Sequence, residues 1–275
     1  MLLPSPVAAE TDTVNDVTLL NPIAVDRVVV PTSIEEIQRL VEDHPGPISI
    51  GGARHSMGGQ IATKGALFLD MREFDDVVAF SPEARTITVE AGIFWRQIQE
   101  VIDPHDLAVL IMQSYANFTV GGSLSVNAHG RYVNQGPLIH SVRSIQLVLA
   151  DGTLVRASPA ERPELFYGAI GGYGGIGVIV TATLDLATNA KVERTVERLD
   201  VREYPAYFQR EIASSGSAVF HNADIYPPAY EFATAITFSA TERDVTVKER
   251  LRPTEGRYWL SRFSYDLLSR IRFAG

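Results

Sequence analysis

The stretch "PISIGGARHSMGGQ", residues 47–60, joins a short apolar run to a glycine-rich loop that contains one histidine. Residues 47–50 are typical of a buried strand, and four of the next ten residues are glycines. Glycine lets a backbone bend sharply or lie close against another group. The loop therefore makes a simple turn, cradles a phosphate group, or presents His55 to a reactive cofactor.

The residues on either side of this loop predict a small parallel β-α-β unit. Residues 26–31 form a β-branched run that indicates a first strand, and residues 65–71 indicate a third. Between the first two strands, Ser33 and Glu36 make a capping box at the start of a helix over residues 33–41. Strands and a helix in this order, with short connections, are typical of a parallel sheet.

The pattern then changes to that of a mixed or antiparallel α+β unit. Residues 76–92 predict a hairpin, and residues 94–102 predict an amphipathic helix. Residues 145–157 give the strongest hairpin signal, two β-rich runs joined by an Asp-Gly turn. A helix over 163–170 and a long strand over 178–186 complete this unit, and two further strands are expected at 217–226 and 232–239.

Composition excludes several classes of function. The chain has 275 residues, a net charge of −9 and a pI near 5.2, which argues against nucleic acid as a partner. The absence of cysteine excludes disulfides, thiolate metal sites and cysteine nucleophiles. No cluster of His, Asp and Glu has convincing metal spacing, and no run of about 20 apolar residues indicates a membrane span. A cytoplasmic location and a trimmed export signal both stay open.

A second glycine-rich stretch, "GYGGIG" at residues 172–177, matches the dinucleotide fingerprint G-x-G-x-x-G. That fingerprint requires a strand before the loop and a helix after it, so that pyrophosphate meets the helix N-terminus. Here a predicted helix precedes the loop and a predicted strand follows it. We therefore reject a nicotinamide-binding fold, and we expect the glycines to pass close to a flat ligand or to make a tight turn.

A third stretch, "GGSLSVNAHGR" at residues 121–131, offers backbone N–H groups, two serine hydroxyls and an asparagine amide. Such donors suit an anion such as pyrophosphate. The alternative is a tight turn that opens a helix of small residues. One extended dinucleotide threaded between two subdomains would explain all three loops together.

Six motifs in this order resemble the FAD-binding domain of the vanillyl-alcohol oxidase and p-cresol methylhydroxylase superfamily, the FAD-linked oxidases. The resemblance covers residues 23–190 and is strongest to the branch of decaprenylphosphoryl-ribose oxidase-like and cytokinin dehydrogenase-like enzymes. It implies an α+β fold in which a two-subdomain FAD-binding domain is followed by the start of a substrate domain. The motifs lie at residues 31–41, 48–60, 69–71, 87–102, 120–130 and 164–186.

The resemblance implies an FAD site built from all three loops. In chain order, the first loop (residues 51–60) would wrap the pyrophosphate with its backbone N–H groups. The second loop (residues 121–131) would line the diphosphate and the other side of the flavin, and the third loop (residues 172–177) would pass beside the cofactor. The residues implied are Gly51, Gly52, Ala53, Arg54, His55, Ser56, Gly58, Gly121, Gly122, Ser123, Ser125, Asn127, Gly130, Gly174, Gly175, Gly177 and Ile179.

His55 falls where many members of this family attach the flavin covalently through its 8α-methyl carbon. Those members usually have Gly-His-Ser, whereas Arg54 precedes the histidine here. Other members lack the histidine and hold FAD without a covalent bond. Covalent attachment through His55 and a histidine that merely contacts the flavin both stay open.

The resemblance implies an FAD-dependent oxidoreductase that takes a hydride from a CH–OH group of a small molecule and is reoxidised by oxygen or another acceptor. We expect residues 1–22 to be an N-terminal extension, residues 23–190 the FAD-binding domain, and residues 191–275 a partial substrate domain whose remainder is missing. The alternative is a flavin-binding fragment without a complete substrate site. The catalytic base stays unknown, because His221, Asp224 and Tyr226 have the spacing of a solvated strand face.

Overall fold

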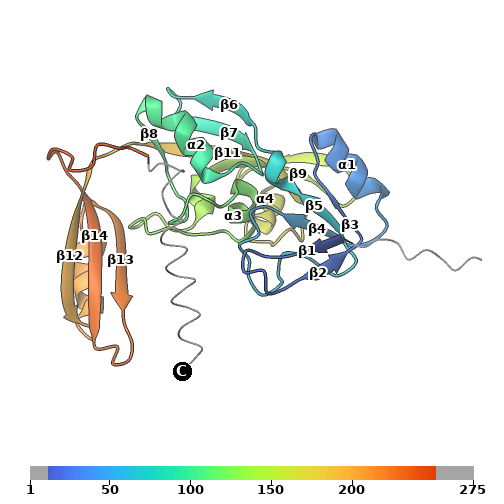
Figure 1. Ribbon diagram of the computed structural model, residues 1–275. Helices are drawn as coiled ribbons and strands as arrows, with labels where there is room; N and C mark the ends of the chain where they lie inside the picture. The colour runs from blue at the N-terminus through green and yellow to red at the C-terminus, as the bar shows by residue number, and fades with distance from the viewer. Residues whose placement is uncertain (1–11, 252–275) are drawn as a thin grey trace, which may run out of the picture. The chain divides into compact units, whose positions relative to one another are not determined.

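The computed structural model describes residues 12–251 (Figure 1). The chain divides into two units, Met1–Arg243 and Asp244–Gly275, and every helix and strand described here lies in the first. The architecture is α+β, as predicted, with one parallel sheet and several antiparallel ones. The segment 257–275, whose apolar spacing predicts an amphipathic helix, falls outside the described residues.

The predicted parallel unit is confirmed. Strands β3 (Arg27–Val29), β5 (Leu67–Asp70) and β4 (Ile48–Gly51) lie in that order, and all pairings are parallel. Helix α1 (Ile34–Asp43) connects β3 to β4 and packs its buried side on the sheet through Ile37 and Val41. This helical crossover lets β4 pair in parallel with β5, so the ends of the two strands lie side by side where the glycine loop begins.

The start of α1 shows how the sequence fixes a helix end. The side chain of Ser33 accepts the N–H of Glu36 at 3.1 Å, as the capping box predicts. The carboxylate of Glu36, however, accepts the N–H of Thr32 at 2.9 Å, one residue earlier than a capping box requires.

The second subdomain is a larger antiparallel sheet with strand order β10-β9-β11-β7-β6, in which β8 also pairs with β11. Both predicted hairpins, β6–β7 and β9–β10, are confirmed, and the long strand β11 lies at the centre of the sheet. The large core contains Trp95 and Ile98 of α2. The bounds of these elements are β6 Val77–Ser81, β7 Thr86–Glu90, α2 Trp95–Ile102, β8 Leu107–Val109, α3 Val120–Ser125, β9 Val142–Val148, β10 Leu154–Ala157, α4 Pro163–Ala169 and β11 Val178–Thr188.

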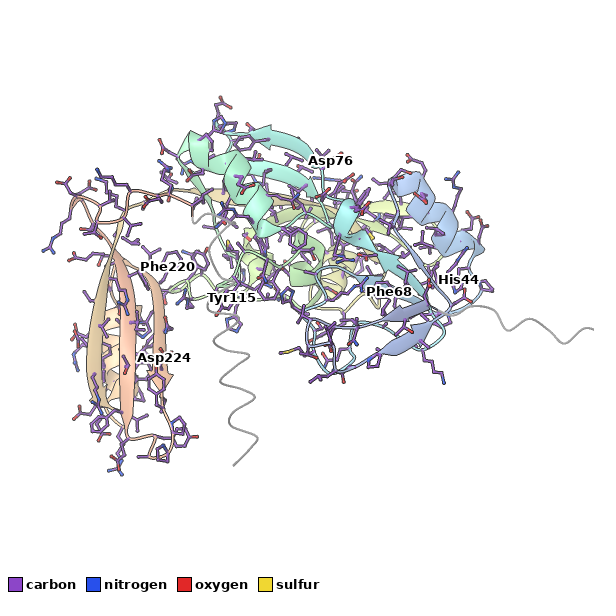
Figure 2. All side chains as sticks on the ribbon, in the orientation of Figure 1. His44, Phe68, Asp76, Tyr115, Phe220 and Asp224 are labelled. Carbon is purple, nitrogen blue, oxygen red and sulfur yellow. The ribbon has the colours of Figure 1, made fainter. Side chains whose placement is uncertain are left out.

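An N-terminal hairpin, which the sequence did not lead us to expect, precedes the parallel sheet. It consists of β1 (Asp12–Val14) and β2 (Ile23–Val25), which pair antiparallel. Its apolar residues Val14 and Val25 pack with Ile61 and with Phe68 of β5. Figure 2 labels Phe68 within the molecule, close to this hairpin. The hairpin therefore lies against the segment that follows the glycine loop.

A three-stranded antiparallel sheet, in the order β12-β14-β13, follows β11. Its strands are β12 (Val192–Asp200), β13 (Ala218–Ile225) and β14 (Phe232–Ala240), so the two strands expected here are confirmed and β12 was missed. The short helical segments of the chain are α5 Tyr204–Tyr207, the π-helix Phe208–Ala213, and the 3₁₀ turns Met71–Glu73, Asp103–His105 and Leu138–Ser141.

The expected solvated face on β13 is wrong for His221. This side chain is 8% exposed, and its two ring nitrogens hydrogen-bond the hydroxyls of Tyr204 and Thr237, each at 2.9 Å. Asp224, labelled on β13 in Figure 2, is half-buried, and Tyr226 is exposed. Period-2 spacing places Asp224 and Tyr226 on one face and His221 on the other, and it does not say that Tyr204 and Phe208 of a helical segment pack against His221.

Within residues 12–251, no helix combines the length and the apolar character that crossing a membrane requires.

Candidate cofactor site

The site is a groove made of two cavities that share part of their walls. The first has a volume of about 200 Å³ and the second about 250 Å³. Gly52, Thr119 and Ser125 line both cavities, so the two adjoin, and we call them together the groove. The groove begins where β4 and β5 end, at the pair Gly51 and Asp70. The carboxyl ends of parallel strands are the usual place for a ligand in open α/β sheets.

Glycine is required at position 52, where the loop of residues 51–60 contacts Thr119 at the start of α3. A Cβ atom at Gly52 would lie 2.1 Å from Oγ1 of Thr119, closer than any real contact allows. Thr119 in turn caps α3, because its side chain accepts the N–H of Gly122 at 3.4 Å. The start of α3 and the loop after β4 therefore touch, and they form two facing walls of the groove.

Thirteen of the seventeen residues predicted from the sequence line this groove. They come from three segments that are far apart in the chain, which the fold brings together. The thirteen are Gly51, Gly52, Ala53, Arg54, His55, Ser56, Gly121, Gly122, Ser123, Ser125, Gly174, Gly177 and Ile179.

The other four predicted residues lie elsewhere. Gly58 donates its N–H to Asp16, and Asn127 accepts the N–H of Ile139 through its side-chain oxygen. A Cβ at Gly130 would lie 2.1 Å from the carbonyl oxygen of Met112, so this glycine serves close packing. Gly175 lines a separate cavity beside β4, together with residues near the end of α1.

His55 lines the groove, and two neighbouring side chains hold its ring. Its Nε2 atom lies 3.1 Å from the amide nitrogen of Asn117 in a hydrogen bond, and its ring centroid lies 4.4 Å from that of Phe118. Its Nδ1 atom is buried and reaches hydrogen-bond geometry with none of the described residues. Burial lowers the pKa of His55, and an interaction with the backbone of Ala53 opposes this only in part. The imidazole is therefore kept neutral, with one nitrogen unsatisfied.

Arg54, which departs from the usual glycine of the family, turns its side chain beneath the loop. Its backbone has a φ of 58°, in the left-handed region that favours glycine. Its guanidinium lies 2.6 Å from the carboxylate of Asp70 and 5.0 Å from the ring centroid of Phe68. The ion pair thus holds the arginine in a conformation that a glycine would adopt without a partner.

Asp70 is shared between two arginines. Its carboxylate is 5% exposed and also binds Arg72, with shortest contacts of 2.6 Å to each guanidinium. Burial by itself would raise the pKa of Asp70, but the hydrogen bond from Arg72 and the positive charges of Arg54 and Arg72 outweigh it, so the pKa is lowered. The same contact raises the pKa of Arg72. Asp70 thus links Arg54 of the loop to Arg72, and Glu73 adds a second negative charge near Arg72.

The loop that matches the dinucleotide fingerprint runs from α4 to β11, so a helix precedes it and a strand follows it. This confirms that the fingerprint is a false match. The loop packs on α3 through backbone bonds, from Gly171 N–H to the Leu124 carbonyl at 2.9 Å and from Tyr173 N–H to the Ser125 carbonyl at 3.0 Å. Residues 121–125 of the stretch 121–131 lie in the short helix α3, which agrees with the alternative left open for it.

Sequence reasoning missed several residues that build the groove. Thr119 and Tyr173 line both cavities, Phe118 lines the second, and Asn117 binds His55. Thr119 carried a usable signal, because threonine before a small-residue helix is a favoured N-cap. The others carried none, since their positions depend on how distant segments meet.

The comparison with protein families decides the identity of the region that contains this groove. The model of the FAD binding domain family matches residues 25–158. These residues are an FAD binding domain. This domain belongs to the FAD-linked oxidase superfamily, as the resemblance of its motifs predicted.

The FAD binding domain has characterised relatives. The chain is 34% identical over 158 residues to alditol oxidase from a Streptomyces species, covering 57% of this chain and 37% of the relative. It is 29% identical over 189 residues to cytokinin dehydrogenase 2 from Arabidopsis thaliana, covering 66% and 37%. It is 27% identical over 155 residues to decaprenylphosphoryl-β-D-ribose oxidase from Mycolicibacterium smegmatis, covering 56% and 34%. The chain therefore spans about a third of the length of these relatives.

The groove has the features that FAD, the cofactor of this domain, requires. It consists of two adjoining cavities, which suits the two halves of a dinucleotide. Gly52 lets a backbone wall come close, and Arg54, a cation, lines the groove in which the negative pyrophosphate would lie. His55 lines the groove, and its Nδ1 atom is buried without a hydrogen-bond partner among the described residues. The residues present therefore fit the cofactor.

Proposed function

We propose that residues 51–56 hold the pyrophosphate and flavin of FAD in this groove, and that the whole protein is an FAD-dependent oxidoreductase. The single observation that carries the proposal is the buried, unsatisfied Nδ1 of His55, in a groove between three small-residue loops. A polar atom buried without a partner costs free energy, and a bound group that satisfies it removes that cost.

Each wall of the groove has a separate task in this proposal. The backbone N–H groups between Gly52 and Ser56 bind the pyrophosphate, and Arg54, fixed by its ion pair with Asp70, places a positive charge at the same wall. The start of α3 and the segment from Tyr173 to Gly177 form the opposite walls. Backbone donors and fixed charges of this kind bind a diphosphate without a mobile lysine.

We infer that His55 bonds the 8α carbon of the flavin through Nδ1. The Asn117 hydrogen bond occupies Nε2, so Nδ1 is the nitrogen that lacks a hydrogen-bond partner, and burial lowers the pKa of the ring. Because Nδ1 is buried, the bond requires the ring to turn toward the flavin. Forming the N–C bond removes one hydrogen from the methyl carbon and one proton from the imidazole. The two electrons released leave with the acceptor that also reoxidises the flavin in turnover, oxygen or another oxidant.

The reaction proposed is oxidation of a CH–OH group in a small molecule. A bound flavin supplies an acceptor for a hydride, and the protein places the donor carbon against it. The names of alditol oxidase and of decaprenylphosphoryl-β-D-ribose oxidase are those of enzymes that oxidise hydroxylated molecules, which supports this class of donor.

A second candidate function is that of a flavin-binding fragment which does not turn over substrate by itself. The observation that favours it is the lining of the groove. The groove-lining residues described include no Asp or Glu, and the catalytic base is still unassigned.

Visible absorbance tests the proposal first. The purified protein should be yellow with the absorbance of a flavin, and a colourless protein that takes up no FAD would refute it. Acid precipitation then separates the two modes of attachment. Colour should stay with the precipitated wild type and with His129→Ala, an exposed histidine used as the control, and should leave His55→Ala. Colour released from the wild type would refute the covalent bond alone.

Anaerobic addition of small alcohols and alditols distinguishes the two candidate functions. Bleaching of the flavin would show that a hydride reaches it, as the oxidoreductase requires. A flavin that stays oxidised with every donor, in a chain that retains its colour, would favour the binding fragment.

A further inference from the structure

A carboxylate of the N-terminal hairpin, Asp16, binds the end of the glycine loop. Its Oδ2 atom accepts the N–H of Gly58 at 3.0 Å and that of Gly59 at 3.4 Å, and the residue is 1% exposed. Gly58 and Gly59 have φ values of 82° and 78°, so their successive N–H groups converge on one oxygen. Turns of this kind form anion-binding nests. This nest is filled by an anion that the chain itself supplies.

The other contacts of Asp16 keep it charged and fixed. Its Oδ1 atom accepts the N–H and the hydroxyl of Thr18, and its Oδ2 atom also accepts the side-chain amide of Asn21 at 2.9 Å. The Thr18 hydroxyl is the main reason why the pKa of Asp16 falls to about 2. The carboxylate is therefore ionised at every pH at which the protein would be handled, and its position is set by its own hairpin.

The residue next to Asp16 holds the other end of the same loop segment. The N–H of Val17 donates to the carbonyl of Arg54 at 3.0 Å. Residues 16–17 thus bind both the residue before His55 and the two glycines that follow it. The apolar contact of Val14 with Ile61 and Phe68 fixes the hairpin in this place.

Two consequences follow for the FAD site. The N–H groups of Gly58 and Gly59 are already bound to Asp16, so the donors for pyrophosphate must come from the segment before Gly58. That segment is held at Arg54 by Val17 and at Gly58 by Asp16, and its conformation decides where the ring of His55 lies. The anchoring residues precede residue 25, where the match to the FAD binding domain family begins.

We propose that Asp16 is a positioning residue of the FAD site, which holds residues 54–59 in the shape that presents His55 to the flavin. This inference rests on the proposed function. It assigns a role in cofactor binding to the segment expected from the sequence to be an N-terminal extension.

The test compares two carboxylates of one hairpin. Asp16→Asn keeps the size of the side chain and removes its charge from the nest. Asp12→Asn is the matched control, because Asp12 accepts the N–H of Val28 at 2.7 Å, outside the loop. Both changes are made in the His55→Ala background, and FAD is titrated into the apoprotein. We expect Asp16→Asn to weaken FAD binding about tenfold, the loss of one hydrogen bond to a charged group, and Asp12→Asn to leave it unchanged.

A second readout separates positioning from general stability. With His55 present, the rate at which added FAD becomes acid-stable should fall in Asp16→Asn, at a temperature where thermal unfolding shows each apoprotein fully folded. If Asp16→Asn does not fold, Asp16→Ala with added formate replaces it. Formate should restore FAD binding by entering the nest, and chloride at equal ionic strength should not.

Three results would overturn the inference. They are FAD binding and attachment by Asp16→Asn at wild-type levels, an equal loss in Asp12→Asn, and rescue of Asp16→Ala by chloride as well as formate. A wild-type chain that takes up no FAD would instead refute the proposed function. The two failures are therefore distinguishable.

Discussion

Two glycine-rich loops border the same groove, and different bonds hold them in place. The loop of residues 51–60 is fixed by the carboxylates of Asp16 and Asp70. The loop of residues 171–177 is fixed by backbone bonds to α3. Composition alone made residues 172–177 look like the nucleotide fingerprint, yet the loop of residues 51–60 carries the histidine. Glycine content thus indicates close packing of a loop, whereas side chains that bind a loop from outside indicate that it holds a functional residue in place.

The largest expected effect tests the packed loop. A Cβ at Gly177 would lie 2.5 Å from the carbonyl oxygen of Val148, in a β-sheet that cannot move away. Gly177→Ala should therefore lower the free energy of unfolding by about 3 kcal/mol, as overpacking does. Urea unfolding of the apoprotein measures the loss. Gly216→Ala is the control, because nothing lies within 4 Å of its Cβ. Equal stability of the two variants would show that close packing does not require glycine at position 177.

The next effect tests the carboxylate-held loop. Asp70→Asn leaves the guanidinium of Arg54 without its charged partner beneath the loop. We expect a loss of about 2 kcal/mol, below the range for a fully buried pair because Arg72 is 46% exposed. Asp185→Asn breaks an exposed pair with Arg143 and should cost less than about 1 kcal/mol. Similar losses in both would show that Asp70 has no special role.

Asp70 also predicts a dependence on pH. Its pKa is lowered in the folded protein, so its contribution to stability is complete above the pKa of the unfolded chain and is lost as pH falls through the folded value. Urea unfolding across acidic pH should show this loss in the wild type and a smaller one in Asp70→Asn. Parallel pH curves for the two proteins would contradict the assigned cause.

A smaller effect concerns the charge of His55. Burial lowers its pKa from the ordinary value of 6.5, so the folded apoprotein binds a proton there less well than the unfolded chain does. Stability should fall as pH drops below 6.5, and His55→Ala should reduce that fall. The NMR titration of His55 checks the direction directly. A midpoint at or above 6.5 would show that the ring is not kept neutral.

The smallest effect is expected at the residue that departs from the family pattern. Arg54→Gly removes the ion pair with Asp70, but it also removes the cost of about 1 kcal/mol for an arginine in the left-handed region. The two changes oppose each other, so the unfolding free energy should change little. Acid-stable flavin should be retained, because the proposed bond is to His55, and its complete loss would mean that attachment requires the arginine.

Local sequence patterns predicted much of the fold. Ser33 and Glu36 marked the start of α1, and the Asp-Gly turn marked the β9–β10 hairpin. These signals depend on neighbouring residues, whose chemistry is visible in the sequence. Strand β12 was missed because "VERTVERLD" is mostly charged and largely exposed, so it has no apolar face to reveal it.

The site could be predicted only where a loop carries its own signal. His55 and the glycines around it were found, whereas Asn117 was not, because a hydrogen bond 62 residues along the chain leaves no local pattern. Gly58 was expected to bind the cofactor, but in the structure its N–H is bound to Asp16. That exchange could not be foreseen, since the β1–β2 hairpin itself was not predicted.

The measurement that tests the central claim most directly is mass spectrometry of a tryptic digest of the purified protein. Cleavage after Arg54 and Lys64 releases the peptide His55–Lys64, which contains the candidate nitrogen. If the loop presents His55 to the flavin, this peptide should carry the mass of FAD less two hydrogen atoms. An unmodified His55–Lys64 peptide, from a preparation whose flavin is attached to another peptide or absent, would contradict the claim.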